Sequence, residues 1–200
     1  MIHAPAHPVT GEANPSTIPG LSTRKFAMWL FLASEVMFFT GLIGAYLATR
    51  FGGANWPIVS EKLNVPLVAV NTFILIVSSV TMVKAFAAIE NGEAKGLIRF
   101  LTATLLLGVV FLSIQGYEWL ELMGHGTIAS TSLFGATFFT LTGFHGLHVL
   151  GGVVTIGFVV LRSLRGWYTL ENHTGIELMG LYWHFVDVVW IFLFTILYLV

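Results

Sequence analysis

Five apolar stretches, each long enough to cross a lipid bilayer, make up most of this chain. They cover residues 26–49, 66–89, 97–122, 133–161 and 176–200. A helix needs about 20 mainly apolar residues to cross the hydrocarbon core. Inside that core the backbone must satisfy its own hydrogen bonds, which an α-helix does within each segment. The sequence therefore predicts an all-α integral membrane bundle of five transmembrane helices, formed by residues 23–200.

The composition supports a membrane protein and excludes several other classes. Of the 200 residues, 56% are hydrophobic and only 10% are charged, and the mean hydropathy is +0.85. The net charge of -1 provides no basic surface, so no nucleic-acid partner is expected. Because the chain has no cysteine, it cannot form disulfides, iron–sulfur clusters or copper centres with thiolate ligands.

The basic residues predict the orientation of the bundle. If successive spans alternate in direction, seven basic residues lie on one side and two, Arg50 and Lys62, lie on the other. The seven are Arg24, Lys25, Lys84, Lys95, Arg99, Arg162 and Arg165. Because basic residues concentrate on the cytoplasmic side, the N-terminus is expected inside and the C-terminus outside. Residues 1–22 lack the pattern of a signal peptide and are expected to form an irregular cytoplasmic arm.

Among the ionisable residues of the predicted spans, we single out five: Glu35, His145, His148, His184 and Asp187. An ionisable group near the membrane midplane costs several kcal/mol unless it is neutralised or paired. Glu35 lies roughly 14 Å from the inner end of its span at 1.5 Å per residue, and its span contains no other charged residue. A lone carboxylate at this depth is a functional-site hypothesis, with a proton or a lipid as its partner.

The other four residues form two pairs on neighbouring spans. His145 and His148 share one face of their helix, as do His184 and Asp187, so antiparallel neighbours could bring the two faces together. One interpretation is a metal or haem site, because histidines on adjacent helices hold such groups in membrane bundles. We favour the other interpretation, a polar core in which these residues form an interhelical hydrogen-bond network and bind no metal.

Two further polar pairs lie near the predicted outer ends of their spans. Gln115 and Glu118 share a face of the third span, and Asn71 and Thr72 lie in the second. We interpret both pairs as interface residues rather than functional ones.

Several segments together resemble one known family. They are SEVMFF (34–39), VPLVAVNTFILIVSS (65–79), IQGYEW (114–119), TFFTLTGFHGLHVLGG (137–152) and LYWHFVDVVWIFLFTILYLV (181–200). In content and order they resemble the characteristic segments of subunit III of cytochrome c oxidase, a haem-copper terminal oxidase. The resemblance extends from Arg24 to Val200.

The resemblance implies a non-catalytic subunit of a proton-pumping oxidase in a prokaryotic-type cell membrane. Such a subunit binds no haem or copper, which are expected in partner subunits. The expected partners are subunit I, subunit II and a small subunit IV. The non-catalytic subunit supports assembly, proton uptake, sustained turnover and the binding of structural phospholipid. Glu35 matches the intramembrane carboxylate of the family, and Arg162 resembles a residue that contacts lipid headgroups. The histidines of FHGLHV and the WHFVD segment match the family's polar core.

Three alternatives accompany this interpretation. Many family members have seven helices, and this chain resembles the shorter five-helix form, which also occurs in quinol oxidases. The glutamate of SEVMFF favours cytochrome c as the electron donor. A b-haem membrane anchor would pair His145 or His148 with His184. A proton-coupled transporter would be built around Glu35, but the chain has neither an internal duplication nor interrupted half-helices.

Overall fold

A computed structural model describes residues 22–52, 56, 63–130 and 132–199. Its long helices are α1 (Thr23–Gly52), α3 (Val65–Glu90), α4 (Ala94–Gly124), α5 (Leu133–Leu164) and α6 (Thr174–Phe194), and α6 continues as the π-helix η1 (Thr195–Leu199). These five helices are long and apolar enough to cross a membrane. The predicted all-helical class is confirmed, and the observed helices extend a few residues beyond most predicted bounds. Residues 1–21 of the predicted arm lie outside the described ranges.

Polar caps and glycines define the helix ends. Asn64 caps α3, its side chain accepting a hydrogen bond from the Leu67 amide at 3.3 Å, and Ser132 caps α5 through the Gly135 amide at 3.0 Å. Such caps satisfy amides that have no partner within the helix. After α3, the chain turns at Gly92, whose φ of 74° lies in the left-handed region that favours glycine. The Asn91-Gly92 pair therefore ends α3, in agreement with the predicted boundary.

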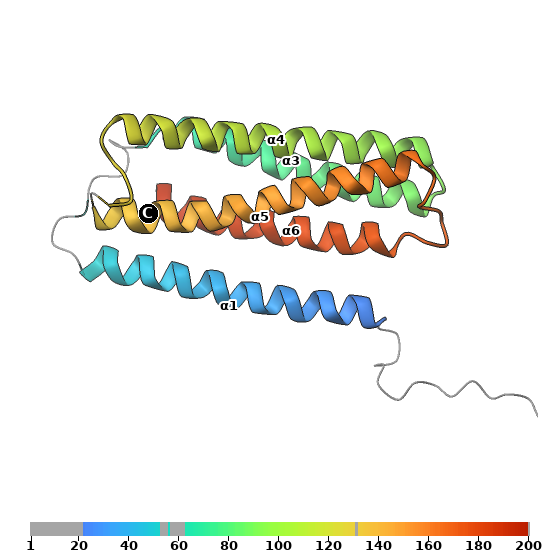
Figure 1. Ribbon diagram of the computed structural model, residues 1–200, viewed down its shortest axis with the longest axis horizontal. Helices are drawn as coiled ribbons and strands as arrows, with labels where there is room; N and C mark the ends of the chain where they lie inside the picture. The colour runs from blue at the N-terminus through green and yellow to red at the C-terminus, as the bar shows by residue number, and fades with distance from the viewer. Residues whose placement is uncertain (1–21, 53–55, 57–62, 131, 200) are drawn as a thin grey trace, which may run out of the picture.

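The helices run antiparallel to their neighbours in sequence, as Figure 1 shows. In that view α4 and α5 form a near layer, and α3 and α6 lie behind them. Each of these four helices packs against two others of the set, whereas α1 packs beside α5 and α6. The start of α1 and the end of α6 lie at opposite ends of the bundle, as an odd number of spans requires.

The side chain of Trp183 fills the centre of the four-helix core. It is fully buried, and its indole nitrogen donates to the Ser78 hydroxyl at 3.0 Å. Glycines of two other helices contact its ring: a Cβ atom at Gly108 would lie 2.9 Å from Cη2, and one at Gly152 would lie 2.7 Å from Cζ3. These two glycines therefore permit close packing of α4 and α5 around the indole.

Helix α1 has a narrow contact with the rest of the bundle. Its buried side chains are Leu32, Phe39 and Tyr46, which are spaced seven residues apart and so form a single stripe along the helix. Most of its other apolar side chains are exposed, including Trp29 and Met37. An exposed apolar surface of this kind is compatible with lipid or with another membrane subunit.

Candidate functional site

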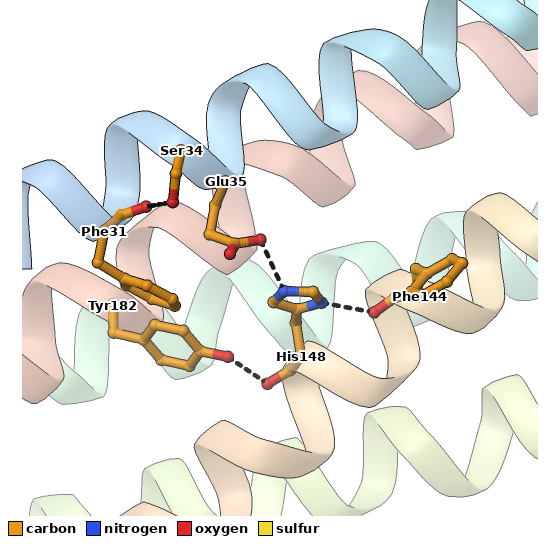
Figure 2. Close-up of polar contacts among 6 residues, drawn as sticks. All are labelled: Phe31, Ser34, Glu35, Phe144, His148 and Tyr182. Carbon is orange, nitrogen blue, oxygen red and sulfur yellow. Dashed lines mark hydrogen bonds and ion pairs between the residues drawn. The ribbon is translucent and has the colours of Figure 1, made fainter.

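Glu35 and His148 meet between α1 and α5, near the middle of both helices (Figure 2). The Glu35 Oε2 atom lies 3.0 Å from the His148 Nε2 atom, and each side chain is 18% exposed. Glu35 is therefore not the lone carboxylate that the sequence indicated. Its partner is a titratable group on another helix, which a search for charges within its own span does not reveal.

The second ring nitrogen of His148 determines how the pair can share protons. Nδ1 lies 2.7 Å from the backbone oxygen of Phe144, and because a carbonyl oxygen only accepts, Nδ1 must carry a hydrogen. The contact between Nε2 and Glu35 then contains one further proton. That proton lies either on the carboxyl group, next to a neutral imidazole, or on Nε2, next to a carboxylate. Both arrangements are neutral overall, which suits the interior of a membrane.

Aromatic side chains surround this pair. The Tyr182 hydroxyl donates to the backbone oxygen of His148 at 2.9 Å, and its ring stacks on Phe31 with centroids 6.2 Å apart. The Phe39 ring lies edge-on to the His148 ring at 5.1 Å. Figure 2 shows Tyr182 reaching from α6 toward the same turn of α5 that His148 occupies. The site is therefore formed by α1, α5 and α6 together.

His145 is separate from the pair although it is three residues from His148. It is fully buried, and within the described part of the chain neither ring nitrogen has a hydrogen-bond partner. Its ring stacks on Trp190 with centroids 4.8 Å apart and lies edge-on to Phe111 at 6.0 Å. The two histidines therefore do not point to the same neighbours, as their shared face predicted. His148 points toward α1, and His145 points toward the bundle interior.

The pair on α6 contacts α3 rather than α5. The His184 Nδ1 atom lies 2.6 Å from the Ser79 hydroxyl, and the same hydroxyl interacts with Asp187. The expected network among His145, His148, His184 and Asp187 is therefore wrong. His148 contacts Glu35, His145 stacks on Trp190, and His184 contacts Ser79. Asp187 is linked to His184 only through the hydroxyl of Ser79, which both side chains contact.

The same geometry bears on the metal and haem interpretations. Among the described residues, no group of three or more His, Cys, Asp or Glu side chains could hold a metal ion. A b-haem anchor would require His145 or His148 to face His184 from the opposite side of one haem plane. Both ring nitrogens of His148 already form hydrogen bonds, and the His145 ring is stacked on Trp190. The proposed histidine pairings are not formed.

A second buried acid lies near the opposite end of the bundle from Arg162. Glu118 is 3% exposed, and its Oε2 atom accepts from the Gln115 amide and from the Tyr198 hydroxyl, each at 2.9 Å. The sequence placed Gln115 and Glu118 on one face but could not supply Tyr198, because a tyrosine in an apolar segment is also typical of the membrane interface. These residues lie in the contacts between the chain's own helices.

Arg162 lies far from the Glu35 site. It is exposed in the last turn of α5, and 14 residues separate it from His148, a rise of about 21 Å along the helix. Its guanidinium group lies 5.3 Å from the centre of the Trp167 ring. A guanidinium beside an indole at a helix end has the chemistry of a headgroup contact. Arg162 and Glu35 therefore belong to different sites.

The fold and the site together define a class of protein. The chain is a multi-pass α-helical membrane protein with an acid–histidine pair at mid-membrane depth.

Comparison with known proteins identifies the family within this class. The sequence model of the family "Cytochrome c oxidase subunit III" matches residues 8–200. The "Probable cytochrome c oxidase subunit 3" of Nocardia farcinica is 37% identical over 200 residues, which cover 100% of this chain and 98% of the relative. The "Cytochrome c oxidase subunit 3" of Corynebacterium diphtheriae is 41% identical, with coverage of 86% and 85%. That of Synechocystis is 45% identical, with coverage of 88% and 75%.

The chain belongs to the cytochrome c oxidase subunit III family. The resemblance noted in the sequence is confirmed, and the chain is a subunit III of a haem-copper oxidase. None of the three relatives is named for a quinol oxidase.

Proposed function

We propose that this chain is the non-catalytic subunit of a cytochrome c oxidase, and that it supports assembly, proton uptake and sustained turnover. The observation that carries the proposal is the hydrogen bond between Glu35 and His148. This pair binds one proton in two interchangeable positions without any change in net charge. It can therefore stabilise the contact between α1 and α5 and exchange protons slowly, while the reaction with oxygen takes place in another subunit.

A cavity beside the pair supports a role in lipid binding. It has a volume of about 360 Å³ and lies between α1, α5 and α6, where its lining includes Met28, Gly151, Thr155 and Tyr182. Tyr182 thus contacts both the cavity and the His148 backbone. A mostly apolar cavity bounded by a hydroxyl fits a phospholipid acyl chain. The headgroup of that phospholipid would lie at the end of the bundle that holds the start of α1 and the end of α5. The basic residues there include Lys25 and Arg162.

The cofactors and partners follow from this role. We expect this chain to bind neither haem nor copper, and we expect these groups in the partner subunits. The proposed partners are the catalytic subunit I and subunit II. A small subunit IV and membrane lipids complete the proposed set. Cytochrome c is the proposed electron donor, because the relatives reported above are named for it. Quinol is the alternative donor.

The proposed location is a prokaryotic-type cell membrane with the N-terminus in the cytoplasm. The observed antiparallel order supports it, since the predicted set of seven basic residues belongs to one end of the bundle: the start of α1, the end of α3, the start of α4 and the end of α5. Arg50 lies at the other end. Lys62, the second basic residue predicted there, lies outside the described residues. An excess of basic residues at one end is typical of the cytoplasmic side.

Purification of the intact complex tests the proposal. The chain would carry an affinity tag in its native host, and the complex would be isolated in a mild detergent. We expect haem and copper to co-purify, together with oxygen consumption driven by reduced cytochrome c. The same preparation with a reduced quinol as donor is the control. Activity with quinol alone would reverse the choice of donor, and the absence of haem and copper from the intact complex would contradict the proposed role.

A further inference from the structure

The imidazole of His184 lies on the outward-facing side of α6. Residues of this side recur every three or four positions and are half-exposed or exposed: Glu177, Leu181, His184, Val188 and Ile191. His184 is near the middle of the continuous span Thr174–Leu199, and therefore near the middle of the membrane. The other members at this depth are apolar. An ionisable side chain is thus placed in the centre of an apolar helix face, where contact with lipid is unfavourable.

The hydrogen bonding of His184 is incomplete within this chain. Nδ1 contacts Ser79 at 2.6 Å. Within the described part of the chain, Nε2 forms no hydrogen bond, and it is not one of the fully enclosed atoms that lack a partner. It therefore reaches the surface. The Oδ1 atom of Asp187 also has no partner among the described residues, but it is enclosed within the bundle. A polar atom without a partner is costly in hydrocarbon, so the accessible Nε2 atom requires a polar partner.

A groove continues from His184 along the same surface. It has a volume of about 180 Å³, and α3 contributes Met82, Val83 and Phe86 to its lining, whereas α6 contributes Gly180, Leu181, His184 and the acidic Glu177. A Cβ atom at Gly180 would approach only Met82, at 3.9 Å, so the glycine leaves room for an incoming side chain. The imidazole thus lies at one end of an apolar groove that can receive a bulky group.

The opposite surface of the bundle, formed by α4 and α5, also has a groove, with a volume of about 470 Å³, but it differs in its exposed polar groups. Its exposed hydroxyl groups donate to carbonyl oxygens of their own helix, Ser113 to Val109 and Thr140 to Ala136. These groups need no external partner, and lipid can cover them.

We propose that the surface of α3 and α6 around Ser79, Val83, His184 and Val188, the α3/α6 face, is where this subunit docks onto the catalytic subunit. Its occupant is a transmembrane helix that presents a hydrogen-bonding group to His184 Nε2 at mid-membrane depth and an apolar side chain to the groove. This inference rests on the proposed function, because it assigns a surface to the contact that the function requires.

Photo-crosslinking in the intact complex tests this assignment. The residue p-benzoylphenylalanine would replace Val188 or Val83 on the α3/α6 face, or Val154 on α5 as a control. Val188 is 49% exposed, Val83 is 53% exposed and Val154 is 50% exposed. The three positions thus match in residue type and exposure and differ in the face on which they lie. We expect Val188 and Val83 to crosslink to a haem-carrying chain, and Val154 to crosslink mainly to lipid.

The haem spectrum of each complex is recorded before irradiation. If haem is present but only the Val154 variant crosslinks to the haem-carrying chain, the docking face is wrong and the proposed function stands. If no haem co-purifies with the unsubstituted chain, the proposed function itself fails. Retention of the subunit during prolonged detergent washing provides a second measurement. We expect His184→Ala to lose the subunit several-fold faster than His184→Gln, which keeps a hydrogen-bonding group. Equal retention of the two variants would contradict the inference.

Discussion

The Oε2 atom of Glu35 lies 3.0 Å from the Nε2 atom of His148, and this contact joins α1 to α5 at mid-membrane depth. Two other polar contacts hold α1 at its ends. Lys25 pairs with Glu177 of α6 at 2.7 Å, and Arg50 donates to the Ile196 backbone oxygen at 3.2 Å. Because the buried side chains of α1 are only Leu32, Phe39 and Tyr46, we expect these polar contacts to contribute substantially to its attachment.

Removal of the central contact should loosen α1. His148→Phe keeps a ring of similar size and eliminates both nitrogen contacts, so we expect a loss of about 0.6 to 2 kcal/mol, the range for hydrogen bonds between membrane helices. The measurement is the free energy of unfolding in mixed micelles. Lys25→Gln is the control, because its ion pair with Glu177 lies at the end of the bundle with side chains 35% and 28% exposed, and a solvent-accessible pair contributes only about 0 to 1 kcal/mol. A larger loss for Lys25→Gln would show that the end contacts dominate.

The contact between Gly152 and Trp183 predicts a steric effect. Gly152→Ala would place Cβ 2.7 Å from Cζ3 of the indole, so the tightly packed core must shift, at a cost of about 1 to 3 kcal/mol. Gly157→Ala on the same helix is the matched control, because no atom lies within 4 Å of its Cβ position, and it should be neutral or stabilising by up to about 1 kcal/mol. Thermal unfolding of both variants compares them, and equal stability would contradict the close packing.

The buried Glu118 predicts a different result for two tyrosines. Tyr198→Phe removes a donor to the Glu118 carboxyl group and should destabilise the subunit by about 1 kcal/mol. Tyr117→Phe is the control. Tyr117 precedes Glu118 in α4 but is 59% exposed, so this substitution should have little effect. Chemical denaturation of the two variants provides the comparison. An equal effect would mean that the buried hydroxyl contributes no net stability.

The sequence was sufficient to predict the helices because long apolar segments leave the backbone no other way to satisfy its hydrogen bonds. It also identified Glu35 and His148 as polar groups at mid-membrane depth. The partners could not be predicted, because partners depend on the rotation of each helix about its own axis. Helices that are apolar on nearly all sides give little information about that rotation.

The two histidines of α5 illustrate this limit. Residues three positions apart differ by about 60° around a helix, which is enough for His148 to reach Glu35 on α1 while His145 stacks on Trp190 of α6. The partner of His184 was missed for a different reason. Ser79 belongs to a residue type that usually satisfies itself within its own transmembrane helix, so its sequence position carries no signal of a contact with α6.

The topology follows from the charge asymmetry and the antiparallel order of the helices. A reporter enzyme that is active only outside the cytoplasm, fused after Val200, should be active, and the same reporter fused after Arg165 should be inactive. The reason is that Arg165 follows α5 at the basic end of the bundle, whereas α6 finishes at the other end. Reporter activity after Arg165 with none after Val200 would show that the orientation is the reverse of the predicted one.

The pairing of Glu35 with His148 makes separate predictions for two substitutions of the acid. In Glu35→Gln, the amide can still donate to Nε2 of a neutral His148, so the contact persists but can no longer transfer a proton. Glu35→Ala leaves Nε2 without a partner in a largely buried site. We therefore expect the Gln variant to assemble and to begin turnover near the normal rate, with faster loss of activity or altered proton uptake. The Ala variant should assemble less well or lose lipid.

Oxygen consumption over many turnovers, measured together with proton uptake, distinguishes these effects in the purified complex. Ser34→Ala is the matched control, because the exposed Ser34 hydroxyl donates only to the Phe31 backbone oxygen, at 2.6 Å, and lies next to Glu35 on the same helix. It should behave as the unsubstituted complex. The decisive result concerns the first turnovers of the Gln variant. If that variant assembled fully with its haems but consumed no oxygen from the start, Glu35 would be an obligatory proton carrier, and the accessory role proposed for this subunit would be wrong.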